Sequence, residues 1–199
     1  MALHTLFRTL VALLFLSIFL QLGASASTST TDSLKAYKKF INDQCNSTTY
    51  PTVCYQYLSP YASTIKRNRL TLTKLSIHVA LKAAKIAKST FTKLSKAKLS
   101  HAESSVIADC KENINDTLDL LQEAADELAH LKGASTPVEK FQWDSIKTWV
   151  SASITDESTC TDELAEMKVR LSLQNKIKTT VYNVSGLISN ALVFVNRLY

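Results

Sequence analysis

The segment CNSTTYPTVC, residues Cys45 to Cys54, holds two cysteines nine positions apart on either side of a Tyr50-Pro51 pair. The flanking sequence, from about residue 32 to residue 61, is compatible with short helices on both sides of that pair. We therefore predict a helical hairpin with its tip at this decapeptide. A disulfide there would fix a piece too small to hold its shape alone.

The N-terminal region has the pattern of a secretory signal peptide. Arg8 precedes an apolar run, 10–20, and the small-residue triplet 24–26. This arrangement predicts a signal peptide over residues 1–26, cut before Ser27. The run has about eleven residues against the roughly twenty of a spanning helix, so we expect a secreted chain with no membrane association after cleavage.

The four cysteines are predicted to form two disulfides, because a secreted chain enters an oxidising compartment and carries them as an even set. Three pairings of Cys45, Cys54, Cys110 and Cys160 are formally possible. The short spacing favours Cys45–Cys54, which leaves Cys110–Cys160. On the loop-entropy model the two closures contribute about 3 and about 4 kcal/mol.

Residues 27–199 are long enough for one domain with its own core, and we expect a single domain. Its formal charge is 22 − 17 = +5, because the signal peptide carries one base and no acid. Three Asn-x-Ser/Thr sequons predict glycosylation at Asn46, Asn115 and Asn183.

Helix-breaking residues are scarce after residue 26, with only two glycines and three prolines. Apolar residues recur every three or four positions in four long segments: 72–94, 107–131, 146–153 and 164–195. We predict an all-α fold: an N-terminal helical hairpin (27–62) followed by a four-helix up-and-down bundle (63–199). The expected breaks between bundle helices fall at Ser100, at the Lys132-Gly133 pair and at residues 158–161.

Charge is distributed unevenly between the first two bundle segments. Residues 64–99 carry ten Lys or Arg and no acid, whereas residues 101–132 carry eight acids and two bases. Two interpretations stay open: the neighbouring helices partly neutralise each other, or a charged face binds a charged partner outside the cell.

Signs of catalysis are weak. The sequence has no glycine-rich phosphate loop and no nucleophile-elbow motif. The three histidines after the signal peptide, at 78, 101 and 130, have no zinc-like spacing from the cysteines. We therefore expect no enzyme activity, no cofactor and no metal site, and export argues against a nucleic-acid partner.

Four blocks of sequence resemble one known family. They are CNSTTYPTVCYQYLSPYA (45–62), ADCKENINDTLDLL (108–121), KTWVSASITDESTC (147–160) and ISNALVFVNRL (188–198). In this order, with all four cysteines in place, they are similar to the plant invertase and pectin methylesterase inhibitors. The resemblance implies a hairpin and four-helix bundle with sequential disulfides, and an inhibitor acting in the apoplast and cell wall.

The family has two branches with different targets. Invertase inhibitors resemble one another in a Pro-Lys-Phe motif between the second and third bundle helices, where Lys and Phe enter the active site. Here the expected loop reads Pro-Val-Glu-Lys-Phe, so Lys140 and Phe141 lack the adjacent proline. The stretches 148–152 and 155–156 are similar to the pectin methylesterase branch, which we favour.

The resemblance implies that bundle helices, not the hairpin, face the enzyme. With Ile114 inward, the 100° step per residue turns four acids of the second bundle helix outward. The expected enzyme-binding residues are Glu112, Asp116, Asp119, Glu123, Ser151, Thr155 and Asp156. The expected partner is pectin methylesterase, whose substrate cleft would be covered. Alternatives are an invertase bound through Lys140 and Phe141, acidic pectin held by the basic helix, or a receptor that recognises the bundle.

Overall fold

A computed structural model describes residues 31–131 and 133–199, so the expected signal peptide, 1–26, lies outside the described residues. A helical segment over 31–45 is followed by seven elements. They are α2 (Pro51–Leu58), the 3₁₀ turn η1 (Ser59–Tyr61), α3 (Ala62–Ile65), α4 (Arg69–Leu94), α5 (His101–His130), α6 (Pro137–Glu166) and α7 (Leu171–Asn196). The described residues contain no strand, and the predicted all-α fold is confirmed.

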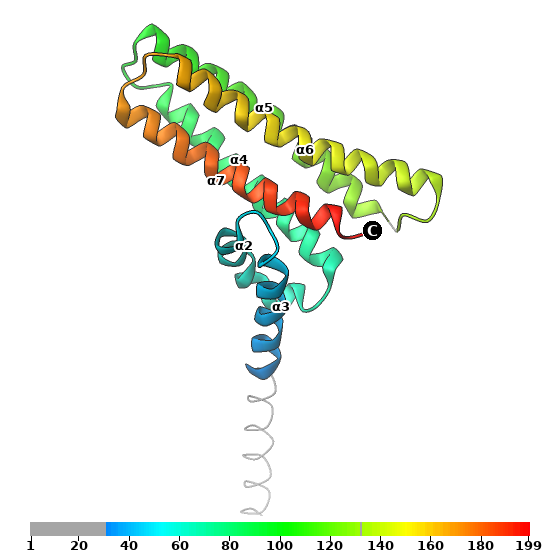
Figure 1. Ribbon diagram of the computed structural model, residues 1–199. Helices are drawn as coiled ribbons and strands as arrows, with labels where there is room; N and C mark the ends of the chain where they lie inside the picture. The colour runs from blue at the N-terminus through cyan, green and yellow to red at the C-terminus, as the bar shows by residue number, and fades with distance from the viewer. Residues whose placement is uncertain (1–30, 132) are drawn as a thin grey trace, which may run out of the picture.

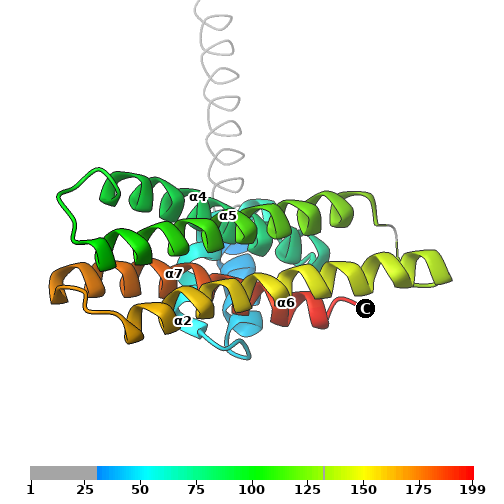
Figure 2. The same cartoon turned by 90° about the horizontal axis from the view of Figure 1, so that it is seen from above.

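Four long helices, α4 to α7, lie side by side and alternate in direction (Figures 1 and 2). α5 packs between α4 and α6, and α7 closes the bundle against α6 and α4. The core between them is mainly aliphatic, with Phe91 as its largest fully buried side chain. Within the described ranges, no helix combines the length and apolarity needed to cross a membrane.

The N-terminal hairpin docks on the α4 and α7 side of the bundle (Figure 1). Asn190 of α7 is buried and clamps the hairpin tip, accepting from the Tyr50 N–H (2.9 Å) and donating to the Tyr50 carbonyl (3.0 Å). Arg197 donates to the hydroxyl and the carbonyl of Ser47. Because α5 and α6 lie on the other side, their outer surface is left uncovered by the hairpin (Figure 2).

Both predicted disulfides are confirmed. Cys45 is bonded to Cys54 across the hairpin tip, with the two Cα atoms 5.6 Å apart. Cys110 is bonded to Cys160, with their Cα atoms 4.7 Å apart, and this bond ties α5 to α6. All four cysteine side chains are buried in the core.

Helix α6 corrects two sequence-based expectations. Residues 137–141 form its first turn and not a loop, because Thr136 and Glu139 build a capping box: Thr136 Oγ1 accepts from the Glu139 N–H (3.2 Å), and the Glu139 carboxylate accepts from the Thr136 N–H (3.0 Å). The predicted break at 158–161 is also wrong. The Ser158 and Thr159 hydroxyls donate to carbonyls four residues earlier, so these residues continue the helix.

The start of the bundle also differs from expectation. Its first helix begins at Arg69 and not at residue 63, because η1 and α3 extend the hairpin to Ile65. Asn68 then caps α4 by accepting from the Thr71 N–H (2.9 Å). The turn between α6 and α7 spans residues 167–170.

Candidate enzyme-binding surface

The acidic residues expected on the second bundle helix all lie on the outer face of α5. Ile114 is buried, as expected, and Glu112, Asp116, Asp119 and Glu123 are exposed. Their spacing places them on one face along about three turns of the helix. We name these four residues the acidic stripe, and it faces away from the hairpin.

Ser151 and Thr155 lie on α6 and line an open groove between α6 and α7. The groove has a volume of about 590 Å³ and is also lined by the Asp144 and Lys147 pair, whose Oδ1 and Nζ atoms are 2.6 Å apart. Among the described residues, neither the Ser151 nor the Thr155 hydroxyl has a hydrogen-bond partner. Neighbouring Thr148, in contrast, donates to the Asp144 carbonyl (2.9 Å). Two free hydroxyls therefore face a groove that a partner can enter.

Asp156 points to the other side of α6, toward α5. It is half-buried, and its Oδ2 atom has no hydrogen-bond partner among the described residues. Burial raises the pKa of this carboxyl, and the Asp116 charge raises it further. The expected residues thus form two adjoining surfaces, with Asp156 beside the acidic stripe and Ser151 and Thr155 in the groove.

Beneath this surface lies Glu157, a buried acid that the sequence reasoning missed. Its Oε1 atom accepts from the Thr117 hydroxyl of α5 (3.1 Å), and its Oε2 atom has no partner among the described residues. Burial raises the pKa of Glu157 to about 8, against the opposing effect of the Thr117 hydrogen bond. A neutral Glu157 therefore sits between α5 and α6 at mildly acidic pH.

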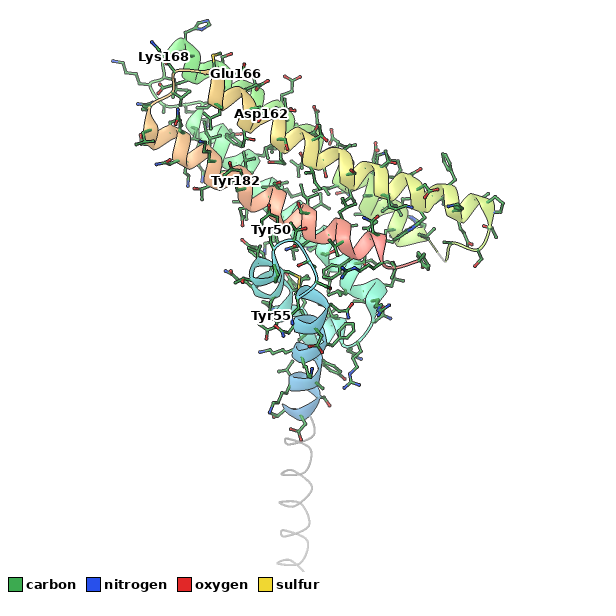
Figure 3. The ribbon with its side chains drawn as sticks, in the orientation of Figure 1. Tyr50, Tyr55, Asp162, Glu166, Lys168 and Tyr182 are labelled. Atoms are coloured by element: carbon green, nitrogen blue, oxygen red, sulfur yellow. A yellow bond between two sulfur atoms is a disulfide. The ribbon has the colours of Figure 1, made fainter. Side chains whose placement is uncertain are left out.

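The acidic surface continues toward the end of α6. Glu163 is half-buried, and burial raises its pKa, with smaller contributions from Asp109, Glu166 and Glu112. Figure 3 shows Asp162 and Glu166 near this end of α6, with Lys168 in the following turn. The seam between α5 and α6 thus gathers acids from both helices.

Lys140 and Phe141 lie at the start of α6, toward the end of the bundle where α5 ends. The Phe141 side chain is 74% exposed. Lys140 pairs with Asp144 one turn later, with Nζ and Oδ2 3.5 Å apart. The two residues are therefore displayed on a rigid helix turn, about 15 to 23 Å along the helix from Ser151 and Thr155 by the rise per residue.

The three sequons occupy different surroundings. Asn46 is exposed at the hairpin tip. Asn115 is half-buried on α5, with a buried Oδ1 atom that has no partner among the described residues. Asn183 is exposed on α7, and its Oδ1 atom accepts from the Tyr57 hydroxyl (3.1 Å). Glycosylation at all three positions stays a prediction.

Within 31–131 and 133–199, no three His, Cys, Asp or Glu side chains are placed to hold a metal ion. Glu157, the carboxyl with the most raised pKa, is enclosed in the bundle and cannot touch a substrate.

The family model for the plant invertase/pectin methylesterase inhibitors matches residues 39–194. The chain belongs to this family. The family model describes inhibitors and not enzymes. Similar proteins include the 21 kDa protein of Daucus carota, 36% identical over 160 residues that cover 80% of this chain and 83% of the relative. Pectinesterase inhibitor 4 of Arabidopsis thaliana is 34% identical over 195 residues, covering 96% and 97% of the two chains.

Solved structures of this inhibitor family share the fold. A crystal structure of a pectin methylesterase inhibitor from Arabidopsis thaliana superposes with a TM-score of 0.56 at 18% identity, covering 80% of this chain and 95% of that chain. A mutant form of an Arabidopsis pectin methylesterase inhibitor gives a TM-score of 0.59 at 20% identity, over 77% and 93% of the two chains.

Proposed function

We propose that this protein is a secreted inhibitor that binds pectin methylesterase through the outer surface of α5 and α6 and covers the substrate cleft. The observation that carries the proposal is that surface: an acidic stripe next to a groove with two free hydroxyls, left open by the hairpin. Family membership supports it, as do relatives named pectinesterase inhibitors that match more than nine-tenths of the chain.

Inhibition of this kind is steric and needs no chemical step or cofactor. The Cys110–Cys160 bond holds α5 and α6 together within the surface, one or two turns from Asp116 and from Asp156. A surface that is already rigid avoids the loss of conformational freedom that a flexible inhibitor suffers on binding. The acidic stripe would steer the inhibitor toward a basic rim around the cleft and act mainly on the association rate.

Invertase is the second candidate target, and one observation favours it. Phe141 is a large apolar side chain exposed at the start of α6, next to Lys140. Against it, the Lys140 ammonium group is held by Asp144 of its own helix. Acidic pectin, the third partner expected from the sequence, would bind elsewhere, on the basic side of the bundle.

Surface variants separate the two docking modes. The double variant Glu112→Lys/Asp116→Lys should slow association with pectin methylesterase by about tenfold, and Thr155→Ala should raise the dissociation rate. Both rates are measured by surface plasmon resonance. The control Asp32→Lys/Asp43→Lys makes the same charge change on the hairpin and should leave both rates unchanged.

The opposite pattern of effects would place the interface at the start of α6. If Lys140→Ala/Phe141→Ala abolishes inhibition while the α5 and α6 variants bind as the wild type does, the protein docks in the invertase-inhibitor mode.

A further inference from the structure

Acidic and basic residues are sorted onto opposite sides of this bundle. Segments 44–102 and 167–199 contain fifteen Lys or Arg and no Asp or Glu, whereas fifteen of the seventeen acids lie within 103–166. The first two segments supply α4 and α7, which are neighbours in the bundle, and the third supplies α5 and α6. The side of α4 and α7 is therefore basic along its whole length.

A row of lysines follows the exposed face of α4. Lys82, Lys85 and Lys93 are exposed, and with Ser89 between them they follow one another at spacings of three and four residues. This spacing keeps them on one face over about 16 Å of helix. None of them forms an ion pair with any residue in the described part of the chain. The acids of α5 therefore leave these charges unneutralised.

An aromatic groove lies at one end of this lysine row, where the hairpin meets α4 and α7. It has a volume of about 320 Å³ and is lined by Tyr57 and Tyr61 of the hairpin, by Lys82 and Ile86 of α4 and by Asn183 of α7. Ile86 is 61% exposed and adds an apolar side chain to the lining of this groove. Tyrosine rings beside polar groups and a lysine suit the apolar faces and the hydroxyl edges of a sugar.

A second hollow, of about 390 Å³, lies where α4 ends and α7 begins. We call the exposed boundary between α4 and α7, from the aromatic groove to this hollow, the seam. It is lined by Leu94 and Ala97 on one side and by Lys176 on the other. Its Arg170 is already paired with Glu103, with Nε and Oε1 2.9 Å apart. Lys176 forms no ion pair within the described residues, and Lys93 of the lysine row directly precedes Leu94 in the chain.

We propose that this seam, from the aromatic groove past the lysine row to the second hollow, binds a linear polysaccharide that carries a carboxylate on successive sugars. Hollows at both ends and lysines between them fit an extended chain better than a compact anion. Electrostatic contacts of this kind release counterions from the polymer, so binding weakens steeply with salt, as it does for nucleic acids.

The choice of a polyuronate among polyanions rests on the proposed function, because removal of methyl esters from pectin leaves carboxylates on that polymer. The inhibitor would then be held on de-esterified pectin by α4 and α7 while α5 and α6, on the opposite side, stay free for the enzyme. This arrangement would concentrate the inhibitor where the esterase has already acted.

Binding to polygalacturonate, measured by affinity electrophoresis and calorimetry, tests the inference without any enzyme. The protein is made in the bacterial periplasm, where disulfides form and Asn183 stays unglycosylated. The wild type should bind polygalacturonate at 20 mM salt and not fully methyl-esterified pectin. Lys82→Gln/Lys85→Gln/Lys93→Gln should lower the affinity at least tenfold and reduce the slope of log affinity against log salt by about two.

Matched variants make the result specific. The control Lys35→Gln/Lys38→Gln/Lys111→Gln makes the same charge change outside the seam, at lysines with no ion pair in the described part of the chain, and should keep the wild-type affinity. Tyr57→Leu should weaken binding to polygalacturonate at least threefold but not binding to polyphosphate, whereas Tyr57→Phe keeps the ring and should behave as the wild type.

Four outcomes would overturn the inference: no binding at 20 mM salt, an equal loss in both triple variants, an equal effect of Tyr57→Leu on both polymers, or tighter binding to anionic phosphatidylserine vesicles than to polygalacturonate. Inhibition of pectin methylesterase, measured in parallel with a soluble substrate, belongs to the α5 and α6 surface. If polygalacturonate binding fails while inhibition persists, only the present inference is wrong. Binding without inhibition would instead contradict the proposed function.

Discussion

Replacing Glu157 with glutamine should remove most of the pH dependence of this protein's stability above pH 5. Burial between α5 and α6 raises the pKa of Glu157 from 4.5 to about 8. A carboxyl with a raised pKa in the folded state favours low pH: its stabilising effect is complete below about pH 4.5 and is lost as the pH rises through about 8.

The magnitude follows from these two values. At 1.36 kcal/mol per pH unit, the interval from 4.5 to about 8 corresponds to about 5 kcal/mol in the free energy of unfolding. Between pH 5 and pH 8 the wild type should lose about 3 to 4 kcal/mol of this amount. Glutamine has nearly the same shape and does not ionise, so the stability advantage of Glu157→Gln over the wild type should grow by about 3 to 4 kcal/mol over the same interval.

Urea unfolding at pH 5 and pH 8, followed by tryptophan fluorescence, measures this difference. Comparing the two pH values cancels any constant cost of burying an amide in place of a carboxyl. Glu123→Gln, an exposed change on α5, is the matched control and should give no such growth. Asp156 and Glu163 also have raised pKa values, so a smaller slope of the same sign should remain in Glu157→Gln. An unchanged slope in Glu157→Gln would refute the assignment of Glu157 as the titrating group.

Three further predictions concern the scaffold and the alternative target. Asn190→Ala should cost about 1–3 kcal/mol of unfolding free energy and speed hydrogen exchange at the hairpin tip, because two partly buried hydrogen bonds to the Tyr50 backbone are lost; unchanged exchange would mean that Asn190 does not hold the hairpin. Cys110→Ser/Cys160→Ser should lower the unfolding free energy by about 4 kcal/mol in urea titrations, as expected for a loop closed over 50 residues, and a loss below 1 kcal/mol would contradict this. Phe141→Ala should change neither the urea midpoint nor pectin methylesterase inhibition, because its side chain projects into solvent.

The hairpin, the bundle and both disulfides could be predicted from the sequence because each leaves a local signal. The Tyr50-Pro51 turn lies between two closely spaced cysteines. In α5 the apolar residues recur with the helical period, so placing Ile114 inward is enough to predict which face of the helix is buried. The exposure of the acidic stripe follows from that same period.

The continuation of α6 through residues 158–161 could not be predicted, because the residue types there give an ambiguous signal. Ser158 and Thr159 belong to residue types that favour turns, and only the structure shows their hydroxyls donating to the helix backbone. The cap formed by Thr136 and Glu139 does leave a sequence signal, Thr-x-x-Glu, which extends the helix back to residue 137.

Two features of the candidate surface could not be predicted because they depend on tertiary contacts. They are the burial of Glu157 and the separation of Thr155 from Asp156. From the sequence, Glu157 would be expected on the surface. In the structure it is buried and accepts a hydrogen bond from Thr117, which lies forty residues away on another helix. Thr155 and Asp156 are adjacent in the chain, yet one lines the groove toward α7 and the other faces α5. The 100° step between them separates two surfaces only because a helix packs on each side.

The most direct test of the proposed function is a titration of a fixed amount of pectin methylesterase with the purified protein, followed by methanol release from methyl-esterified pectin. Invertase is titrated in parallel under the same conditions. We predict a saturating loss of pectin methylesterase activity, with an end point near one inhibitor per enzyme, and unchanged invertase activity. Full pectin methylesterase activity at a tenfold excess of the protein, or inhibition of invertase alone, would contradict the account.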